Sequence, residues 1–413
     1  MITVFGLGFV GLTTALGFAH LGYKVYGVDV DEERMATIKK GKLPFLEPDM
    51  ETVLRRELNE HFFVTGDASK AVKNSEYVFY CVGTPYGKDG AANLDYLFSA
   101  IDTTLAAAQD GQFRVLVTKS TIPPGTTVER IAPYVAGHAP KKGNFGVANN
   151  PEFLREGHCW QDFTEADRIV LGVSDDRSRE MLVKLYEPMG LPIKCVSTST
   201  GEFVKYLSNT MLATMISYSN EMAGIADAIG DIQVAEAFRI LHMDKRWGGC
   251  SMTSYVYPGC GYGGYCLPKD TNALLAQAET KGAETPILKS VIDTNHRRPR
   301  TIAEKILRGA GREAVVGIMG LSFKPNSDDV RDTPAAHIIR ALLNRNCRRI
   351  LAYDPVAMEE FRKHYPELAV ELRDSAKEVY DEANVIAIVT AWEEFREIPA
   401  MGDKPIVDCR YML

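Results

Sequence analysis

The sequence predicts an α/β protein with two doubly wound sheet domains joined by a long central helix. Three observations carry this prediction. The chain opens with a strand, a glycine-rich turn, a helix and a second strand. Its last third repeats this pattern in a shorter form, and residues 201–229 read as one long apolar helix between the two. Strands that alternate with helices in this way build parallel sheets covered by helices.

The bulk composition narrows the classes of function. The chain has 413 residues, a net charge of −7 and a pI near 5.7, whereas a nucleic-acid-binding surface is normally basic. No signal-peptide pattern precedes the first strand and no apolar run reaches about 18 residues, so we expect neither export nor a membrane span. The eight cysteines include no Cys-x-x-Cys pair. We therefore expect a reduced, cytoplasmic protein without a disulfide framework or a metal site.

The first turn has the spacing of a dinucleotide-binding turn. A strand at residues 2–5 enters it, and a helix read at residues 12–21 leaves it. In this spacing Gly6 allows the tight turn, Gly8 lets the backbone approach a pyrophosphate, and Gly11 lets the helix pack on the strand. Asp29 ends the second strand and can accept both ribose hydroxyls, which favours NAD over NADP. The alternative is a glycine-rich turn that binds no cofactor. The run reads Gly6-Leu7-Gly8-Phe9-Val10-Gly11.

Two further strands end in polar residues. Residues 77–82 lead into Gly83-Thr84-Pro85, and residues 115–118 lead into Lys119-Ser120-Thr121. Ligands of doubly wound sheets bind at the carboxyl ends of the strands, so Thr84 and Thr121 are candidates to line a cofactor site. For each threonine the alternative is a helix N-cap.

Two pairs of polar residues stand four positions apart. Glu152 and Glu156 follow a short strand and would share one face if their turn is helical, where two carboxylates suit acid–base chemistry. The alternative is an exposed helix start that favours acidic residues. Lys205 and Asn209 share a face of the long helix and could bind a developing oxyanion, unless they are ordinary exposed polar residues. A helix that is apolar on several faces is usually buried between domains or in a dimer interface.

A glycine cluster beside a cysteine is the densest chemical signal in the chain. Four glycines between Pro258 and Tyr265 precede Cys266-Leu267-Pro268-Lys269-Asp270. The glycines let the backbone approach a ligand, and Cys266 is a candidate nucleophile next to a cation and a carboxylate.

The last third of the chain repeats the strand–helix–strand pattern without the full glycine motif. Its first turn reads Gly320-Leu321-Ser322, and Asp354 ends its second strand as Asp29 ends the earlier one. Lys324 and Arg331 follow the turn and favour a different phosphate-bearing ligand. The alternative is a structural domain with surface cations.

Together these motifs resemble the UDP-glucose/GDP-mannose dehydrogenase family over essentially the whole chain. The resemblance implies an NAD-binding Rossmann domain at residues 1–198, a helical dimerisation domain with the cysteine loop at 199–300, and a Rossmann-like nucleotide-sugar-binding domain at 301–413. Three more segments carry it. They are Asn150-Pro151-Glu152-Phe153-Leu154-Arg155-Glu156-Gly157, Asp167-Arg168-Ile169-Val170 and Phe323-Lys324-Pro325-Asn326.

The resemblance implies a four-electron oxidation of the C6 alcohol of a nucleotide sugar. Two NAD are used, and the aldehyde is held on Cys266 as a thiohemiacetal and then as a thioester. UDP-glucose is the expected substrate and UDP-glucuronate the product. GDP-mannose or a UDP-N-acetylhexosamine are alternatives with the same chemistry. More remote alternatives are a two-electron hydroxyacid-type dehydrogenase and a non-catalytic NAD-binding protein.

The resemblance also implies roles for individual residues. Lys205 and Asn209 would hold the oxyanion, with Asp270 orienting Lys205 or a water. Glu152 would act as acid and base in thioester hydrolysis, with Thr121 placing the water. Expected NAD contacts are Gly6, Gly8, Phe9, Val10, Gly11, Asp29, Arg34, Thr84, Thr121, Glu156, Lys269 and Arg331. Expected sugar-nucleotide contacts are Glu152, Phe153, Leu154, Arg155, Glu156, Lys205, Asn209, Arg246 (across a homodimer formed through the central helix), Tyr255, Tyr257, Pro258, Gly259, Gly263, Phe323 and Lys324.

The chain departs from the family pattern in two places. Residues 247–257 form a longer segment, which we expect to cover the substrate and to bear on the choice of base and sugar. Tyr265-Cys266-Leu267 replaces the common Ser-Cys-Phe.

Overall fold

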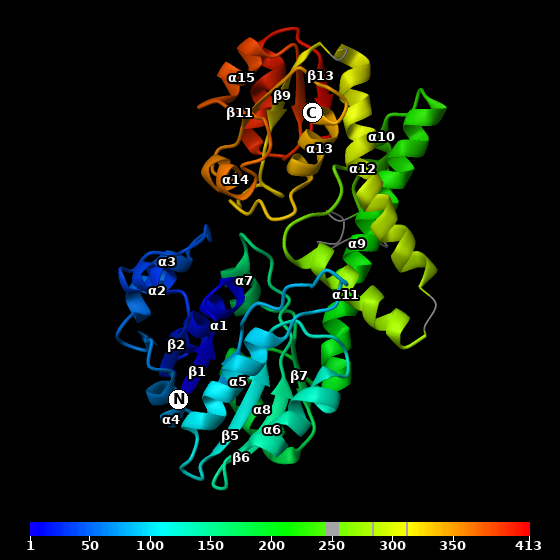
Figure 1. Ribbon diagram of the computed structural model, residues 1–413. Helices are drawn as coiled ribbons and strands as arrows, with labels where there is room; N and C mark the ends of the chain where they lie inside the picture. The colour runs from blue at the N-terminus through cyan, green and yellow to red at the C-terminus, as the bar shows by residue number, and fades with distance from the viewer. Residues whose placement is uncertain (245–255, 283–284, 311–312) are drawn as a thin grey trace. The chain divides into compact units, whose positions relative to one another are not determined.

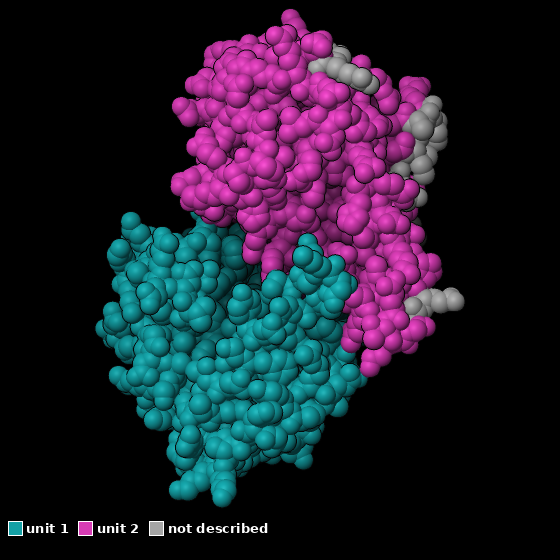
Figure 2. Space-filling model, in the orientation of Figure 1, with its two compact units in different colours: residues 1–207 teal, residues 208–413 magenta. Residues whose placement is uncertain are grey.

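The computed structural model describes residues 1–244, 256–282, 285–310 and 313–413. The chain divides into two compact units, residues 1–207 and residues 208–413 (Figures 1 and 2). Among the described residues each unit contains one β-sheet, as the repeated strand–helix pattern predicted. Among the described helices, none is both long and apolar enough to span a membrane.

The sheet of the first unit has eight strands in the order β3-β2-β1-β4-β5-β6-β7-β8. Neighbouring strands are parallel except β6 and β7, which pair in antiparallel fashion. The carboxyl ends of β1, β2, β4, β5 and β6 therefore meet at one edge. The strands are β1 (Ile2–Phe5), β2 (Val25–Val28), β3 (Phe62–Val64), β4 (Tyr77–Tyr80), β5 (Phe113–Thr118), β6 (Asn144–Asn149), β7 (Ile169–Val173) and β8 (Ile193–Val196).

Two apolar cores flank this sheet. Along β1, Val4 belongs to one core and Phe5 to the other, because successive side chains of a strand point to opposite faces. Helices α1, α3 and α8 contribute to the first core, and α4, α5 and α6 to the second. The sheet is thus doubly wound. The helices are α1 (Phe9–His20), α2 (Glu32–Lys39), α3 (Met50–Glu57), α4 (Ala68–Lys73), α5 (Asp95–Ala107), η1 (Thr127–Ile131), α6 (Ala132–His138), α7 (Cys159–Thr164), α8 (Asp176–Tyr186) and η2 (Glu187–Met189).

The long helix predicted at residues 201–229 is α9 (Thr198–Ile229), which begins in the first unit and continues into the second. It contains no proline. Gly230 follows it with a left-handed φ of +80°, and the Gly230 N–H donates to the Ala226 carbonyl at 3.0 Å. This is a glycine helix stop, because a left-handed residue satisfies a terminal carbonyl and turns the chain away.

The sheet of the second unit is fully parallel, in the order β11-β10-β9-β12-β13. Helices α12, α13 and α14 contribute to the core on one face, and α15 and η4 to the core on the other. The elements after α9 are α10 (Val234–Met243), α11 (Cys266–Thr280), α12 (Pro286–Ala310), β9 (Val315–Met319), α13 (Pro334–Leu343), β10 (Arg349–Tyr353), α14 (Met358–His364), β11 (Glu371–Leu372), α15 (Ala376–Glu382), β12 (Val385–Ile388), η4 (Glu393–Met401) and β13 (Ile406–Asp408).

The glycine-rich stretch leads into α11 and is anchored by α12. The Tyr262 N–H donates to Asn295 Oδ1 at 2.8 Å, and Asn295 Nδ2 donates to the Tyr262 carbonyl at 2.9 Å. A Cβ at Gly263 would lie 2.3 Å from the Asp332 carbonyl oxygen, so this close approach requires glycine. These contacts fix the segment that precedes Cys266.

Candidate active site

The glycine turn connects β1 to α1 as the sequence predicted. A Cβ on Gly11 would lie 1.7 Å from the Gly6 carbonyl oxygen, so only glycine lets the helix approach the strand. Gly8, in contrast, faces open space, because no described atom lies within 4 Å of a Cβ built there. The helix begins directly after Gly8, earlier than predicted, so its first amides face this open space. The turn fits the pyrophosphate of NAD.

Asp29 is held at the same turn by backbone donors. Its Oδ2 accepts the Leu7 N–H at 2.6 Å, and its Oδ1 accepts the Asp31 N–H at 2.9 Å. Arg34 Nη1 lies 3.1 Å from Oδ2. The carboxylate therefore has a fixed direction at the end of β2, where a ribose would be bound.

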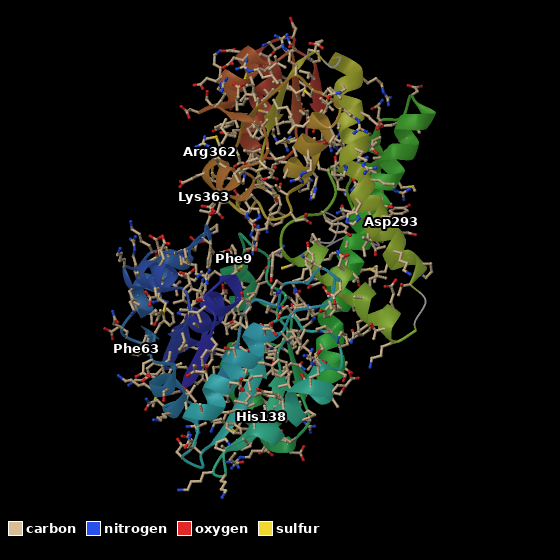
Figure 3. All side chains as sticks on the ribbon, viewed as in Figure 1. Phe9, Phe63, His138, Asp293, Arg362 and Lys363 are labelled. Atoms are coloured by element: carbon tan, nitrogen blue, oxygen red, sulfur yellow. The ribbon has the colours of Figure 1, made fainter. Side chains whose placement is uncertain are left out.

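Phe9 follows Gly8 and packs against an aromatic ring from a distant segment. It is the first residue of α1 and is labelled in Figure 3. Its ring centroid lies 4.1 Å from that of Phe45, a residue that sequence reasoning did not single out. Phe45 precedes α3 in a stretch without periodicity, so nothing local in the sequence indicates the contact.

Thr84 and Thr121 join the ends of β4 and β5. Thr84 Oγ1 donates to the Thr121 carbonyl at 2.8 Å, and Thr84 is buried. The N-cap alternative is wrong for both, because Leu94 precedes α5 and Thr126 precedes η1. Thr121 also lines a small pocket of the first unit. The pocket is formed by Thr118, Ser120, Thr121, Ile122, Asn149, Pro151, Glu202 and Lys205.

The segment around Glu152 is a loop, so the helical face predicted for Glu152 and Glu156 is wrong. The Glu152 carboxylate accepts the Leu154 N–H at 2.6 Å, a local bond that competes with helix formation. The two glutamates therefore do not form a carboxylate pair on one helix.

Glu152 instead pairs with Lys205. Lys205 Nζ lies 2.7 Å from Glu152 Oε1, and both side chains are 6% exposed. Asn209, one turn further along α9, is also buried. The alternative of ordinary exposed polar residues is therefore wrong for Lys205 and Asn209. A buried charge of this kind is stable only with a partner, and here each ion supplies it for the other.

A second buried lysine follows β5. Lys119 Nζ donates to Asn150 Oδ1 at 2.7 Å. Burial lowers the pKa of Lys119 to about 8, although the negative charge of Glu152 acts in the opposite direction. Sequence reasoning treated this residue only as the end of a strand. A lysine directly after an otherwise apolar strand was the available signal.

Cys266 is the first residue of α11 and is exposed. A helix N-terminus stabilises a thiolate. Lys269 lies one turn further on. Burial disfavours its charge, but Asp270 and the Cys266 thiolate outweigh this and raise the pKa of Lys269. The cysteine therefore has a cation within electrostatic reach, as the sequence suggested.

Asp270 is fully buried and connects two predicted residues of the second unit. Its Oδ1 accepts a hydrogen bond from Lys269 Nζ, and its Oδ2 accepts one from Asn209 Nδ2. Lys269, Asp270 and Asn209 thus form one polar cluster at the start of α11. This cluster fixes the direction in which the Asn209 amide points.

The other predicted contact residues have these positions. Arg155 pairs with Asp162 at 2.6 Å, and Glu156 lies in the same loop. Tyr257 donates to the Tyr411 carbonyl at 2.8 Å. Pro258 and Gly259 are buried, Phe323 lies against Gly264, and Lys324 Nζ lies 5.3 Å from the Phe323 ring. Arg246, Tyr255 and the rest of residues 245–255 lie outside the described residues.

The fold and these clusters define a dinucleotide-binding dehydrogenase that carries a candidate nucleophile. Sequence models of the UDP-glucose/GDP-mannose dehydrogenase family match the NAD binding domain at residues 1–190, the central domain at 199–297 and the UDP binding domain at 317–413. The chain belongs to this family. The prediction of an NAD-dependent oxidoreductase that acts on a nucleotide sugar is thereby confirmed.

Relatives match along nearly the whole chain. The UDP-glucose 6-dehydrogenase of Pseudomonas aeruginosa is 36% identical over 409 residues, which covers 96% of this chain and 88% of that protein. The Rhizobium meliloti enzyme of the same name is 37% identical over 412 residues, covering 96% and 90%. The structure of a UDP-glucose dehydrogenase from Pyrobaculum islandicum matches with a TM-score of 0.93 and 36% identity, covering 99% and 94%.

A relative named for a different sugar also shares the fold. The UDP-D-ManNAc dehydrogenase of Pyrococcus horikoshii matches with a TM-score of 0.86 and 28% identity, covering 100% of this chain and 96% of that one. Enzymes that are named for different sugars thus share this architecture.

Proposed function

We propose that the protein oxidises UDP-glucose to UDP-glucuronate and uses two NAD for each sugar. The observation that carries the proposal is the position of Cys266, exposed at the start of α11 beside Lys269. A two-electron dehydrogenase has no use for a nucleophilic thiol, whereas a four-electron oxidation needs a group that holds the aldehyde. The similar enzymes named UDP-glucose 6-dehydrogenase support the choice of sugar.

In the proposed reaction each cluster has one task. Bound NAD supplies the hydride acceptor for both oxidation steps. The Cys266 thiolate adds to the C6 aldehyde and gives a thiohemiacetal, and oxidation of this adduct gives a thioester. Lys205 and Asn209 donate to the C6 oxygen as it gains negative charge. Asp270 orients the Asn209 amide through its hydrogen bond.

Glu152 is assigned to the hydrolysis of the thioester. Its Oε1 lies 2.7 Å from Lys205 Nζ, and we assign the carboxylate to accept a proton from an attacking water. Thr121 lines the adjoining pocket and would help to place this water. Cleavage of the C–S bond then releases the carboxylate product and returns the thiol.

The binding assignments follow the clusters. We assign NAD to the glycine turn, Asp29, Arg34, Thr84, Thr121, Glu156, Lys269 and Arg331. We assign the nucleotide sugar to the loop of residues 152–156, Lys205, Asn209, Arg246, Tyr255, Tyr257, Pro258, Gly259, Gly263, Phe323 and Lys324. The division into domains at residues 1–198, 199–300 and 301–413 remains part of the proposal.

A homodimer formed through α9 is a further part of the proposal. Phe203, Leu207 and Met211 recur every four residues on α9 and are 45%, 54% and 54% exposed. A row of exposed large apolar side chains along one helix is typical of a protein contact. We expect Leu207→Asp to halve the mass measured by light scattering. Val128→Asp, at an apolar residue that is 56% exposed outside this row, is the control. An unchanged mass for Leu207→Asp would reject the α9 interface.

We place the reaction in the cytoplasm. The described cysteines are free thiols, which suits a reducing compartment.

The choice of sugar is tested by a turnover screen. The purified protein is given NAD with UDP-glucose, GDP-mannose or UDP-N-acetylhexosamines, and NADH formation is followed. We expect kcat/KM for UDP-glucose to exceed that for the others by about tenfold or more. A higher value for another sugar would replace UDP-glucose as the substrate. NAD binding without turnover of any of these sugars would reject the proposed activity. Full turnover by Cys266→Ala would favour a two-electron enzyme.

A further inference from the structure

Tyr265 stands directly before the proposed nucleophile and contacts two cations. It is the residue that precedes α11. The Arg331 guanidinium carbon lies 4.6 Å from the centre of its ring, and Lys269 Nζ lies 5.6 Å from it. At such distances a cation is attracted to the negative face of an aromatic ring. One ring therefore attracts positive groups from two different elements.

Arg331 reaches the ring from the loop between β9 and α13. Its Nη2 lies 2.7 Å from Asp329 Oδ2, and its Nε donates to Asp329 Oδ1 at 2.9 Å. Its own N–H also donates to Asp329 Oδ1 at 2.9 Å. Asp329 is itself buried. A guanidinium bound through two nitrogens has a fixed plane, so its position over the ring is built into the loop.

Lys269 reaches the ring from α11. Its side chain is 4% exposed and forms an ion pair with Asp270. Lys269 also stands three positions after Cys266 on α11, and residues three apart on a helix are neighbours on its surface. The lysine that contacts the ring is therefore a helical neighbour of the thiol.

The residues before Cys266 lie against the loop that carries Arg331. A Cβ on Gly263 would lie 2.3 Å from the Asp332 carbonyl oxygen, and one on Gly264 would lie 3.1 Å from the Phe323 ring. Tyr265 is the last residue of this continuous contact before the thiol. The packing of this loop against Gly263 and Gly264 therefore helps to fix the position of the start of α11.

We propose that Tyr265 is a positioning residue that holds Arg331 and Lys269 as one cationic cluster beside the Cys266 thiol. The proposal rests on the nucleophilic role assigned to Cys266. Two like charges repel each other, and the ring offsets this repulsion by attracting both. Without the ring, Lys269 keeps its ion pair with Asp270 but loses its contact with Arg331 through the ring, and the thiolate loses part of the positive charge that stabilises it. A serine, common at this position in the family pattern, offers no such face.

The test measures the reactivity of the Cys266 thiol and needs neither NAD nor sugar. Iodoacetamide labelling of the full-length protein is followed between about pH 6 and pH 10, with the Cys266 peptide quantified by mass spectrometry. Cys195 is also exposed and serves as the internal reference. We expect Tyr265→Leu to slow labelling near neutral pH by about three- to tenfold and to raise the pH midpoint. Tyr265→Phe keeps the ring and should label at the wild-type rate.

A second substitution tests the coupling. Arg331→Gln should slow labelling in the protein with Tyr265 and have little further effect after Tyr265→Leu, because the cluster is already lost. Asp270 and Asp329 remain in every variant, as does Asp332, which is bound to His337. Their charges therefore contribute equally to each profile. Tyr96→Leu, at an exposed tyrosine of α5, is the matched control.

Three outcomes would overturn the proposal. They are wild-type labelling of Tyr265→Leu, slowing of Tyr265→Phe as large as that of Tyr265→Leu, and additive effects of Tyr265→Leu and Arg331→Gln. Should Tyr265→Leu unfold in circular dichroism, the other two variants decide. Slow labelling of Arg331→Gln with normal labelling of Tyr265→Phe supports the proposal, and any other combination rejects it. Because labelling needs no turnover, a protein that fails the sugar screen can still pass this test.

Discussion

The turn after β1 and the turn after β9 have the same backbone conformation, but only the first has open space beside it for a ligand. Gly6 and Gly320 have φ values of +85° and +96°, and the N–H of each donates at 2.8 Å to the last carbonyl of the neighbouring strand. In each turn an aspartate at the end of that strand accepts the N–H of the leucine after the glycine. Asp29 does so at 2.6 Å and Asp354 at 2.7 Å. The backbone geometry is therefore the same in both halves.

The next residue decides between an open and a closed turn. Gly8 faces open space, whereas Ser322 stands at the matching place and is buried. Asp354 is fully buried, and the protein itself supplies its donors. These donors are the N–H groups of Leu321, Ser322, Val356 and Ala357, the Ser322 hydroxyl and the Trp392 indole N–H.

The comparison teaches that an aspartate at the end of a second strand is not by itself a sign of a ribose site. Helix α1 begins directly after Gly8, but α13 begins only at Pro334. The chain between Gly320 and Pro334 instead carries Lys324 and Arg331, the candidate contacts for another ligand. The second turn thus stabilises the fold, and the candidate ligand contacts lie in the loop that follows it.

The largest expected effect is on stability and comes from replacing Asp354, the buried aspartate of the closed turn. Asp354→Ala leaves several buried donors without an acceptor, and we expect it to lower the free energy of unfolding by about 3–5 kcal/mol. NAD affinity, measured by fluorescence titration below the unfolding temperature, should stay within about twofold of wild type. Asp403→Ala, at an exposed aspartate, is the control for stability. A loss of NAD affinity as large as that of Asp29→Ala would mean that the second turn binds the dinucleotide.

The two sheets also differ in the sign of a buried charge at a strand end. Lys119 follows β5 in the first sheet, and Asp354 follows β10 in the second. The pKa of Lys119 is lowered from 10.5 to about 8. The unfolded chain therefore binds more protons between these values, and stability rises with pH across that window. We expect the wild type to gain about 3 kcal/mol over Lys119→Met between pH 8 and pH 10.5.

Urea unfolding at several pH values measures this gain. Asn150 Oδ1 still accepts the Tyr186 hydroxyl at 2.5 Å after the substitution, so no buried acceptor is left unpaired. Lys24→Met, at an exposed lysine, should show no such pH dependence. Parallel stability curves for the wild type and Lys119→Met would show that Lys119 stays charged when folded.

The smallest expected change in stability comes from a substitution at the open turn, Gly8→Ala, which should weaken NAD binding. Gly8→Ala adds a methyl group to open space at an extended backbone, so the free energy of unfolding should change by less than about 1 kcal/mol. The methyl group would stand where the pyrophosphate approaches, and we expect the Kd for NAD to rise by about 10- to 100-fold. Gly137→Ala, whose added Cβ also meets no described atom, should leave the Kd unchanged. An unaltered Kd for Gly8→Ala would place the dinucleotide elsewhere.

The sequence was most informative where one residue type is required by local geometry. The glycines of the first turn and the strands that enter it were predicted for this reason. The length of α12 does not follow from local residue preferences. A proline normally ends a helix, yet Pro299 lies inside α12. Downstream residues such as Ile302 and Ile306 belong to the apolar core, and this packing outweighs the local cost.

Side-chain partners were beyond sequence reasoning when they come from distant segments. Spacing suggested that Glu152 pairs with Glu156, but the structure pairs it with Lys205, more than fifty positions away. Such a pair depends on where β6 and α9 lie, and no local pattern encodes this. The same holds for Arg331 and Tyr265, whose contact depends on how the loop after β9 packs on the glycine stretch.

The central claim is most directly tested by the stoichiometry of the reaction. Limiting UDP-glucose is converted to completion with excess NAD, and NADH and UDP-glucuronate are both quantified. Since each NAD accepts two electrons, a four-electron oxidation through Cys266 predicts two NADH and one UDP-glucuronate for each sugar, with no free aldehyde captured by a hydrazine trap. One NADH for each sugar, with a trapped aldehyde as the end product of the wild-type enzyme, would contradict it.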